Sequence, residues 1–325
     1  MANPATSAAA PARASKAPEA GELVATRRRR RYSLLTRPDK ILIALMVGIP
    51  LALDILFIWG PTVASVLLSF TDWAGIGDVT PQNVVGLKNY TTLFTGYAFF
   101  WPAFQHNLIW LAFLSFIATP LGMFLAVLLD RELRGKRIYQ SIFFLPVVLP
   151  LVVVGFIWTL QYAPSDGFIN NAFGLVKSGN IIDWFGNPSI NLYAVLFATS
   201  WRHIGYIMVL YLAGLKSVDP SLREAAKVDG ATEVQTFFNV VLPVMAPINV
   251  IIVVVTAIEA LRAFDLAFII NRGTNGLELL SILITNNSIS EASLIGFGSA
   301  IAVVLLVISL VPIVLFLSRT MRSQA

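Results

Sequence analysis

Long apolar runs constrain this sequence more than any other feature. Six segments are long and apolar enough to cross a bilayer, and they cover residues 41–70, 104–129, 138–160, 190–215, 244–270 and 293–318. About 20 apolar residues span the hydrocarbon core as a helix, and a spanning backbone must satisfy its own hydrogen bonds. The sequence therefore predicts an all-α membrane protein with six transmembrane helices.

The composition agrees with a membrane protein and excludes several kinds of chemistry. Of the 325 residues, 57% are hydrophobic and only 13% are charged, whereas a soluble domain carries about 25% charged residues. Cysteine is absent and there are two histidines, which excludes disulfides, thiolate metal sites and a cysteine nucleophile. We expect no catalytic, cofactor-binding or metal-binding residue in this chain.

The positive charges predict how the chain crosses the membrane. If the six segments cross in alternation, eighteen of the 23 lysines and arginines lie on the side that holds the N-terminus. Lysine and arginine accumulate in cytoplasmic loops, so we expect both termini in the cytoplasm. The net charge of +5 then follows from topology.

Residues 1–37 precede the first apolar segment and are predicted to form a disordered, basic cytoplasmic tail. They are rich in alanine and proline and contain five arginines at positions 27–31. Such a block binds either anionic membrane lipid or nucleic acid. A membrane segment follows directly, so the pattern favours lipid and we expect no nucleic-acid partner.

The stretch "EAAKVDGATEVQTFFNVVLP" at 224–243 is an organised polar segment between two apolar ones. Its first helix begins either at Asp219, an N-cap followed by Pro220, or at a capping box of Ser221 and Glu224. Gly230 can adopt the left-handed conformation that ends a helix. The pattern predicts a short helix and a glycine turn on the cytoplasmic side.

A second helix follows this turn. Thr232 and Gln235 form another capping-box pair, so the loop is predicted to read helix, turn, helix. A DNA-binding helix-turn-helix has a similar outline, but membrane segments flank this loop closely on both sides. The small surface of Ala225 and Ala226 suits docking into a groove on another protein.

The spacing of the loop resembles a known family signature. Glu224-Ala225-Ala226, three residues, Gly230, nine residues, Val240, one residue and Leu242-Pro243 resemble the EAA motif of bacterial ATP-binding-cassette (ABC) importer permeases. "VGLKNY" (85–90), "LAGLKSV" (212–218), "FINNAFG" (168–174) and "AFDLAFII" (263–270) are similar to the carbohydrate branch, which comprises maltose-type and glycerol-phosphate-type permeases. The resemblance covers residues 41–319 and departs from the family at "NRGTNGLE" (271–278).

This resemblance implies a type I ABC importer permease fold in a multi-pass protein of the bacterial cell (inner) membrane. Its implied role is the transmembrane subunit of a sugar importer, whose EAA helix docks in a cleft of a separate ATPase. The residues carried over to that coupling are Glu224, Ala225, Ala226, Asp229 and Gly230.

The resemblance also implies the partners and the organisation of the chain. The partners are a cassette ATPase dimer that binds ATP and magnesium, a second and different permease chain, an extracytoplasmic sugar-binding protein, the sugar and membrane lipid. No G-x-x-x-x-G-K-[ST] phosphate loop occurs in this chain. The expected parts after the tail are 38–101 (first helix and extracytoplasmic loop), 102–319 (permease core with coupling loop 218–243) and 320–325 (cytoplasmic tail).

Polar residues in the fourth and fifth apolar segments predict a substrate path, because such residues are costly in lipid and face an interior or a water-filled path. They share helical faces at one-turn spacing and offer hydrogen bonds and an aromatic surface to a sugar. They are Thr199, Arg202, His203 and Tyr206 in the fourth segment and Thr256, Glu259 and Arg262 in the fifth. The structural alternative is a Glu259–Arg262 salt bridge, with Arg202 reaching the outer surface.

Two other functions remain as alternatives at this point. An ion-coupled secondary transporter would use Asp54 in the first segment as a proton site, although Asp54 also suits a structural pairing with an arginine. A membrane enzyme would use Glu259, Arg262 and Asp265 as an acid cluster. Neither an inverted repeat nor a nucleophile–base pair is evident, so the sequence favours the permease.

Overall fold

A computed structural model of the chain describes residues 36–131, 133–289 and 293–324. The chain divides into two compact units, Met1–Phe57 and Ile58–Ala325. In the first unit the described part is helix α1 (Arg37–Asp54) with the start of the π-helix η1 (Ile55–Trp59). The tail predicted at 1–37, with its five arginines, lies almost entirely outside the described residues.

Helix α1 begins at a capping box that the sequence analysis did not identify. The backbone N–H of Thr36 donates to the carboxylate of Asp39 (2.9 Å), and the Thr36 hydroxyl accepts from the Asp39 N–H (3.4 Å). Pro38 occupies the first turn, where its missing N–H costs no hydrogen bond. The apolar side chains that follow, such as Met46 and Phe57, are exposed, as in a helix that meets lipid or another protein.

The second unit is helical in its described residues, apart from connecting turns and one isolated β-bridge between Thr71 and Val84. Its first half contains α2 (Gly60–Leu68), η2 (Pro81–Asn83), α3 (Lys88–Thr91), η3 (Thr92–Gly96), α4 (Phe100–Phe113), η4 (Leu114–Ala118), α5 (Thr119–Asp130), α6 (Lys136–Val148), α7 (Leu151–Gln161), α8 (Phe168–Ala172) and α9 (Leu175–Ser178). Its second half contains α10 (Asn191–Ser217), α11 (Pro220–Val228), α12 (Glu233–Thr236), η5 (Phe237–Val241), α13 (Leu242–Val244), α14 (Ala246–Leu261), α15 (Asp265–Asn271), α16 (Leu280–Ser288) and α17 (Ile295–Gln324).

Helices long and apolar enough to span a bilayer confirm the multi-pass membrane class. Four meet the criterion alone, namely Pro38–Leu68, Phe100–Asp130, Asn191–Ser217 and Ile295–Ser318. Two bent pairs meet it only together, namely Lys136–Val148 with Leu151–Gln161 and Glu233–Val244 with Ala246–Asn271. The described residues therefore contain four to six spans, and the predicted six requires each bent pair to count as one. We number the spans in that way below.

The third span is not the single helix that the apolar run at 138–160 predicted. It breaks between α6 and α7 with a bend of 101°. Pro150 lacks an N–H and disfavours helical backbone at the preceding residue, and Leu149 is indeed extended (φ −68°, ψ 138°). The expectation of one unbroken helix was wrong, because apolar character alone does not report a proline-induced break.

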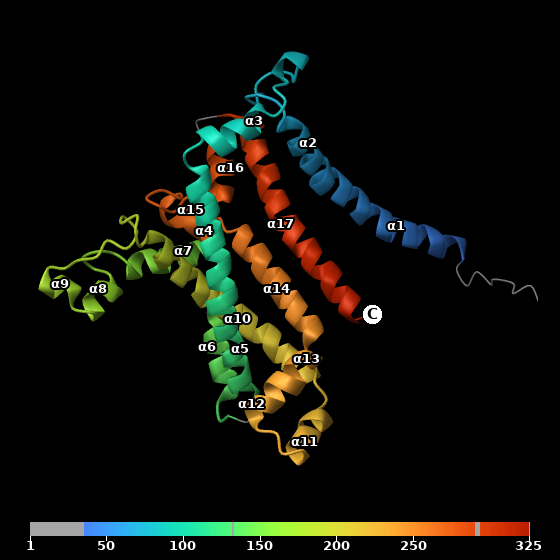
Figure 1. Cartoon of the computed structure of the whole chain (residues 1–325), viewed down its shortest axis with the longest axis vertical. Helices are drawn as coiled ribbons and strands as arrows, with labels where there is room; N and C mark the ends of the chain where they lie inside the picture. Colours follow the sequence, from blue (N-terminus) through green and yellow to red (C-terminus); the bar gives the residue numbers. More distant parts are fainter. Residues whose placement is uncertain (1–35, 132, 290–292, 325) are drawn as a thin grey trace, which may run out of the picture. The chain divides into compact units, whose positions relative to one another are not determined.

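Close packing of α5 against α10 forms the centre of the second unit (Figure 1). An apolar cluster that includes Ala126, Ile207 and Met208 fills the half that leads to α11 and α12. A second cluster, with Trp110 and Val195, fills the other half. These two clusters hold the polar residues described below at fixed positions between them.

The contact between α5 and α10 predicts that Gly122 cannot be enlarged. A Cβ atom on Gly122 would lie 2.8 Å from the Ile207 Cβ and 2.9 Å from the Ile204 carbonyl oxygen. Overpacking of this kind costs about 1–3 kcal/mol, so Gly122→Ala should lower the melting temperature of the purified chain in detergent. Gly48→Ala is the matched control, since no described atom outside the neighbouring backbone of its own helix lies within 4 Å of its Cβ position. Equal melting temperatures for the two variants would contradict this packing.

Candidate functional site

A cavity of about 270 Å³ lies among the second to fifth spans. Its lining contains six of the seven residues predicted for the substrate path, namely Thr199, Arg202, His203, Tyr206, Glu259 and Arg262. The rest of its lining comes from Trp110, Leu114, Val147, Leu151 and the segment from Ala263 to Ala267. The structure therefore brings the two predicted helical faces together around one space.

A break in the fifth span shapes this cavity. Helix α14 ends at Leu261 and α15 begins at Asp265, so the carbonyls at the break lack their usual helical partners. The Asn107 side-chain amide donates to the Leu261 carbonyl (3.3 Å), and the Ser281 hydroxyl donates to that of Ala263. Side chains from two other helices thus stabilise the break, and Arg262 and Asp265 stand on either side of it.

The two arginines and two acidic residues of the cavity have no side-chain partner within the described ranges. The ion pairs in the described residues involve other side chains. No side-chain hydrogen bond to a described residue is made by Arg202, Glu259, Arg262 or Asp265. The Glu259–Arg262 salt bridge, which was the structural alternative, is not formed. Two cations and two carboxylates therefore surround the cavity with balanced charge and with free hydrogen-bonding capacity.

Thr256 and His203 belong to a buried polar triangle. The Thr119 and Thr256 hydroxyls lie 3.3 Å apart, and the His203 Nε2 lies 3.3 Å from the first and 3.4 Å from the second. These three residues join the second, fourth and fifth spans. His203 also lines the cavity, whereas Thr256 does not, so a path role for Thr256 stays a prediction.

Trp110 is a cavity residue that the sequence analysis missed. It is almost fully buried in α4, and its indole N–H has no hydrogen-bond acceptor among the described residues. Arg202 is another lining residue, and its Nε is likewise buried without a partner. Tryptophan in membrane proteins favours the membrane interfaces. A tryptophan well inside an apolar run is therefore unusual, and this position could have identified Trp110 as a candidate cavity residue.

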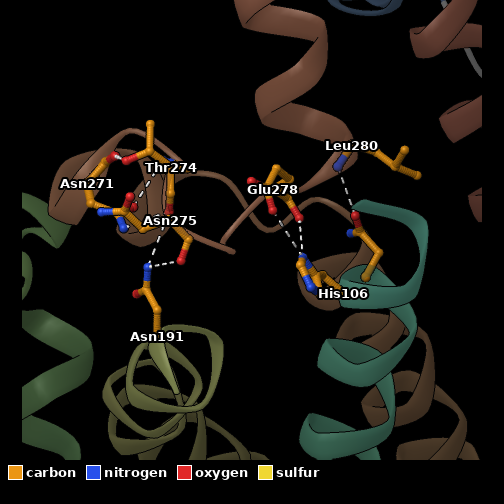
Figure 2. A network of polar contacts seen from close by, with 9 residues as sticks. His106, Asn191, Asn271, Thr274, Asn275, Glu278 and Leu280 are labelled. Carbon is orange, nitrogen blue, oxygen red and sulfur yellow. Dashed lines mark hydrogen bonds and ion pairs between the residues drawn. The ribbon is translucent and has the colours of Figure 1, made fainter. Parts of the chain in front are cut away.

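The loop after α15, which contains the stretch that departed from the family pattern, is held by α10 (Figure 2). The Asn191 side-chain amide at the start of α10 donates to the carbonyls of Thr274 (3.3 Å) and Asn275 (3.1 Å). Four loop residues have positive φ, among them Arg272 at 56° and Gly276 at 80°. A Cβ atom on Gly276 would lie 2.6 Å from the Pro188 carbonyl oxygen, so glycine is needed there.

Helix α4 holds the other end of the same loop (Figure 2). The His106 Nδ1 lies 2.8 Å from the Glu278 carbonyl oxygen and 3.9 Å from its carboxylate. The next residue, Asn107, accepts a hydrogen bond from the Leu280 N–H (3.0 Å). The loop is therefore tied to two of the helices that line the cavity.

Helix α11 has the boundaries that its capping residues predicted. Asp219 is the N-cap and accepts from the Ser221 N–H (2.9 Å), which decides between the two predicted starts. This backbone bond, with a smaller contribution from the Ser221 side chain, holds the pKa of Asp219 below its usual value. The cap therefore stays ionised at neutral pH.

The turn after α11 is a Schellman motif. The N–H of Ala231 donates to the Ala226 carbonyl (2.9 Å), and that of Gly230 to the Lys227 carbonyl (3.1 Å). Gly230 has φ 79°, which confirms its predicted left-handed conformation. The second capping box is also confirmed, because the Thr232 N–H donates to the Gln235 side chain (2.9 Å).

The two alanines of the signature differ in their surroundings. Ala226 is 7% exposed and packs within the chain, whereas Ala225 is exposed, as are Glu224 and Asp229. Leu222 and Val228 are also exposed, three residues before and after Ala225. The small apolar surface that is open to another protein is therefore centred on Ala225 and does not include Ala226.

Two ion pairs fasten this loop to the end of the second span. The Arg223 guanidinium contacts the Asp130 carboxylate (2.8 Å), and that of Arg131 contacts the Glu233 carboxylate (2.6 Å). Arg223 also donates to the Leu215 carbonyl (3.1 Å). Figure 1 shows α12 near the end of α5, with α11 beyond it.

Comparison with known proteins finds relatives that are components of transport systems. Residues 118–323 match the family model described as "Binding-protein-dependent transport system inner membrane component". The chain is 34% identical to a xylose/arabinose import permease of Haloferax volcanii, over 81% of this chain and 83% of that protein. It is 29% identical to a diacetylchitobiose uptake permease of Streptomyces coelicolor, over 92% and 86% of the two chains.

Solved structures show the same fold. A chain of a bacterial ABC transporter that imports the acidic polysaccharide alginate matches with a TM-score of 0.74 at 20% identity, over 88% of this chain and 96% of that chain. A second structure of an alginate transporter, in complex with an alginate-bound periplasmic protein, matches with a TM-score of 0.73. With the sequence matches, these findings place the chain in the family of inner-membrane components of binding-protein-dependent transport systems, the ABC importer permeases.

Proposed function

We propose that this chain is the translocation subunit of an ATP-driven sugar importer. The observation that carries the proposal is the cavity whose two arginines and two acidic side chains have no partner in the described structure. Sugar hydroxyls both donate and accept hydrogen bonds, so a sugar can meet cationic and anionic groups at once. The named substrates of relatives, xylose and arabinose or diacetylchitobiose, are saccharides and support this class.

The energy for transport comes from a separate ATPase dimer. Exposed Glu224, Ala225 and Asp229, with the Gly230 turn, form a short helix with a small apolar surface, which suits insertion into a cleft. Ala226 supports that surface from within the chain. The ATPase holds ATP and magnesium, so this chain needs no cofactor of its own.

The complete transporter contains further partners. An extracytoplasmic binding protein delivers the sugar, in keeping with the family description, and a second permease chain completes the path. Both termini and the loop 218–243 lie in the cytoplasm, and six spans cross the bacterial inner membrane. Membership of this family argues against the alternative of a membrane enzyme. The loop 218–243 argues against the alternative of an ion-coupled transporter.

The chain has no cysteine, so single-cysteine variants test this topology directly. Ser178→Cys should react with a membrane-impermeant maleimide in intact cells, because its loop is extracytoplasmic. Ser15→Cys in the tail and Arg134→Cys between α5 and α6 should react only after permeabilisation. Reaction of all three from one side would rule out the six-span arrangement.

Substitutions in the cavity should impair uptake without disturbing assembly. Arg262→Ala and Glu259→Ala each remove a charged hydrogen-bonding group, worth about 1.5–3 kcal/mol. We therefore expect uptake affinity to fall about tenfold to a hundredfold, measured with the whole transporter in vesicles. Lys88→Ala, an exposed residue away from the cavity, is the control.

Trp110 tests the same cavity through the loss of a single N–H group. Trp110→Phe removes an N–H that has no partner in the described structure, so the melting temperature should not fall, while KM should rise about twofold to tenfold. Trp158→Phe is the matched control, because its N–H is also unpartnered but does not line this cavity. Normal uptake in the Arg262, Glu259 and Trp110 variants would mean that the sugar passes elsewhere.

Coupling is tested at Ala225 and Gly230. Ala225→Trp should block docking of the ATPase, seen in a pull-down, without unfolding the loop. Gly230→Val should strain the turn, because a β-branched residue tolerates positive φ poorly. The space around Gly230 is open, so Gly230→Asn, which accepts this conformation, should restore coupling.

The readout for both positions is ATPase association together with substrate-stimulated hydrolysis in vesicles. Ala226→Trp is a less clean probe, because Ala226 is buried and its enlargement disturbs the loop itself. Normal association and normal stimulation in Ala225→Trp and Gly230→Val would show that another element couples the subunits.

A further inference from the structure

A second cavity, of about 400 Å³, lies between the coupling loop and the cytoplasmic end of the second span. One wall comes from α5 (Met123, Phe124 and Val127) and the other from η5 (Phe237, Phe238 and Val241). Neither the substrate path nor the coupling residues use this space. Its volume lies in the range of sites for small molecules.

The cavity changes from apolar to charged along both walls, in the same direction. On α5 the apolar residues are followed by Asp130 and Arg131, where the span ends. On the other wall Glu233 precedes the apolar residues of η5, and the Arg131–Glu233 ion pair shows that the charged ends lie at one level. The apolar part therefore points into the bilayer and the charged rim lies at its cytoplasmic surface, given the topology proposed above.

The rim carries one positive charge in excess. Asp130 is paired with Arg223, and Glu233 with Arg131. Lys227 also lines the cavity, and it makes no ion pair with any described residue. A single uncompensated ammonium group matches the single negative charge of a phosphodiester.

A buried hydroxyl offers a second polar contact inside this cavity. Thr236 is 6% exposed, and its Oγ1 has no hydrogen-bond partner among the described residues. A buried hydroxyl without a partner costs free energy. A phosphate or ester oxygen that entered from the rim would satisfy it.

The outer edges of both walls are open. Phe124 and Phe238 are about half exposed, although they adjoin the buried residues of the cavity. Acyl chains lower the free energy when they cover such apolar side chains. Basic sites beside transmembrane helices on the cytoplasmic side bind anionic headgroups by the same charge complementarity.

We propose that this cavity binds one anionic phospholipid of the cytoplasmic leaflet. The phosphodiester lies at the rim against Lys227 and the Thr236 hydroxyl, and an acyl chain lies between the walls of α5 and η5. The lipid contacts the coupling loop and the second span at once, so it braces the junction that the two ion pairs form.

The test counts lipid bound to the purified whole transporter. The complex is delipidated in detergent, exposed to equal amounts of phosphatidylglycerol and phosphatidylcholine, and examined by native mass spectrometry. We expect one phosphatidylglycerol per copy of this chain, in preference to phosphatidylcholine. Val127→Trp, which fills the cavity, should abolish this retention, while the melting temperature reports that the fold is intact.

Two charge variants separate lipid binding from a structural role of the rim. Lys227→Gln should weaken phosphatidylglycerol retention about fivefold, the effect of about one lost cationic contact. Glu233→Gln breaks an ion pair but frees Arg131, so retention should stay equal or rise. If both substitutions lower retention equally, the rim is structural and the proposal fails.

Two further outcomes would also overturn the proposal. Equal retention of the two lipids would mean unspecific coverage of an apolar surface. Retention by the isolated chain but not by the whole transporter would mean that a partner subunit fills the cavity. Neither readout uses sugar uptake, and the maleimide experiment tests topology separately, so failure here is distinct from failure of the proposed function.

Discussion

The break in the fifth span depends on hydrogen bonds from other helices. The hydrocarbon core offers no water, so a carbonyl without a partner costs several kcal/mol there. Asn107 meets this requirement twice, because its amide donates to the Leu261 carbonyl and its oxygen accepts from the Leu280 N–H. One nearly inaccessible side chain, with Ser281, thus joins three helices and allows Arg262 and Asp265 to flank the break.

The balanced charges around the cavity follow from the same geometry. Ionisable groups at membrane depth are costly unless water, a ligand or a partner solvates them. A direct pair between Glu259 and Arg262 would lower that cost within this chain, yet the described structure does not form it. The groups keep their hydrogen-bonding capacity for whatever enters the space.

Most features with local causes could be predicted from the sequence, although the break at Pro150 was missed, and features with distant causes could not. The cap at Thr232 and the turn at Gly230 depend on neighbouring residues, so their spacing predicted them correctly, and Asp219 was one of the two caps that the sequence allowed for the first helix. The helical faces around Arg202 and Glu259 followed from periodicity. The break after Leu261 did not, because no glycine or proline marks it and its stabilising side chains lie far away in the chain. The burial of Ala226 and the unpartnered indole N–H of Trp110 also depend on tertiary packing.

The two ion pairs that fasten the loop of α11 and α12 differ in their response to salt. The Arg131 and Glu233 side chains are 59% and 72% exposed, whereas those of Arg223 and Asp130 are 33% and 19% exposed. Dissolved ions screen exposed pairs strongly and half-buried pairs much less. Rising ionic strength therefore loosens the α12 end of the loop first and leaves α11 held to the second span, so the loop would hinge about Arg223 rather than detach.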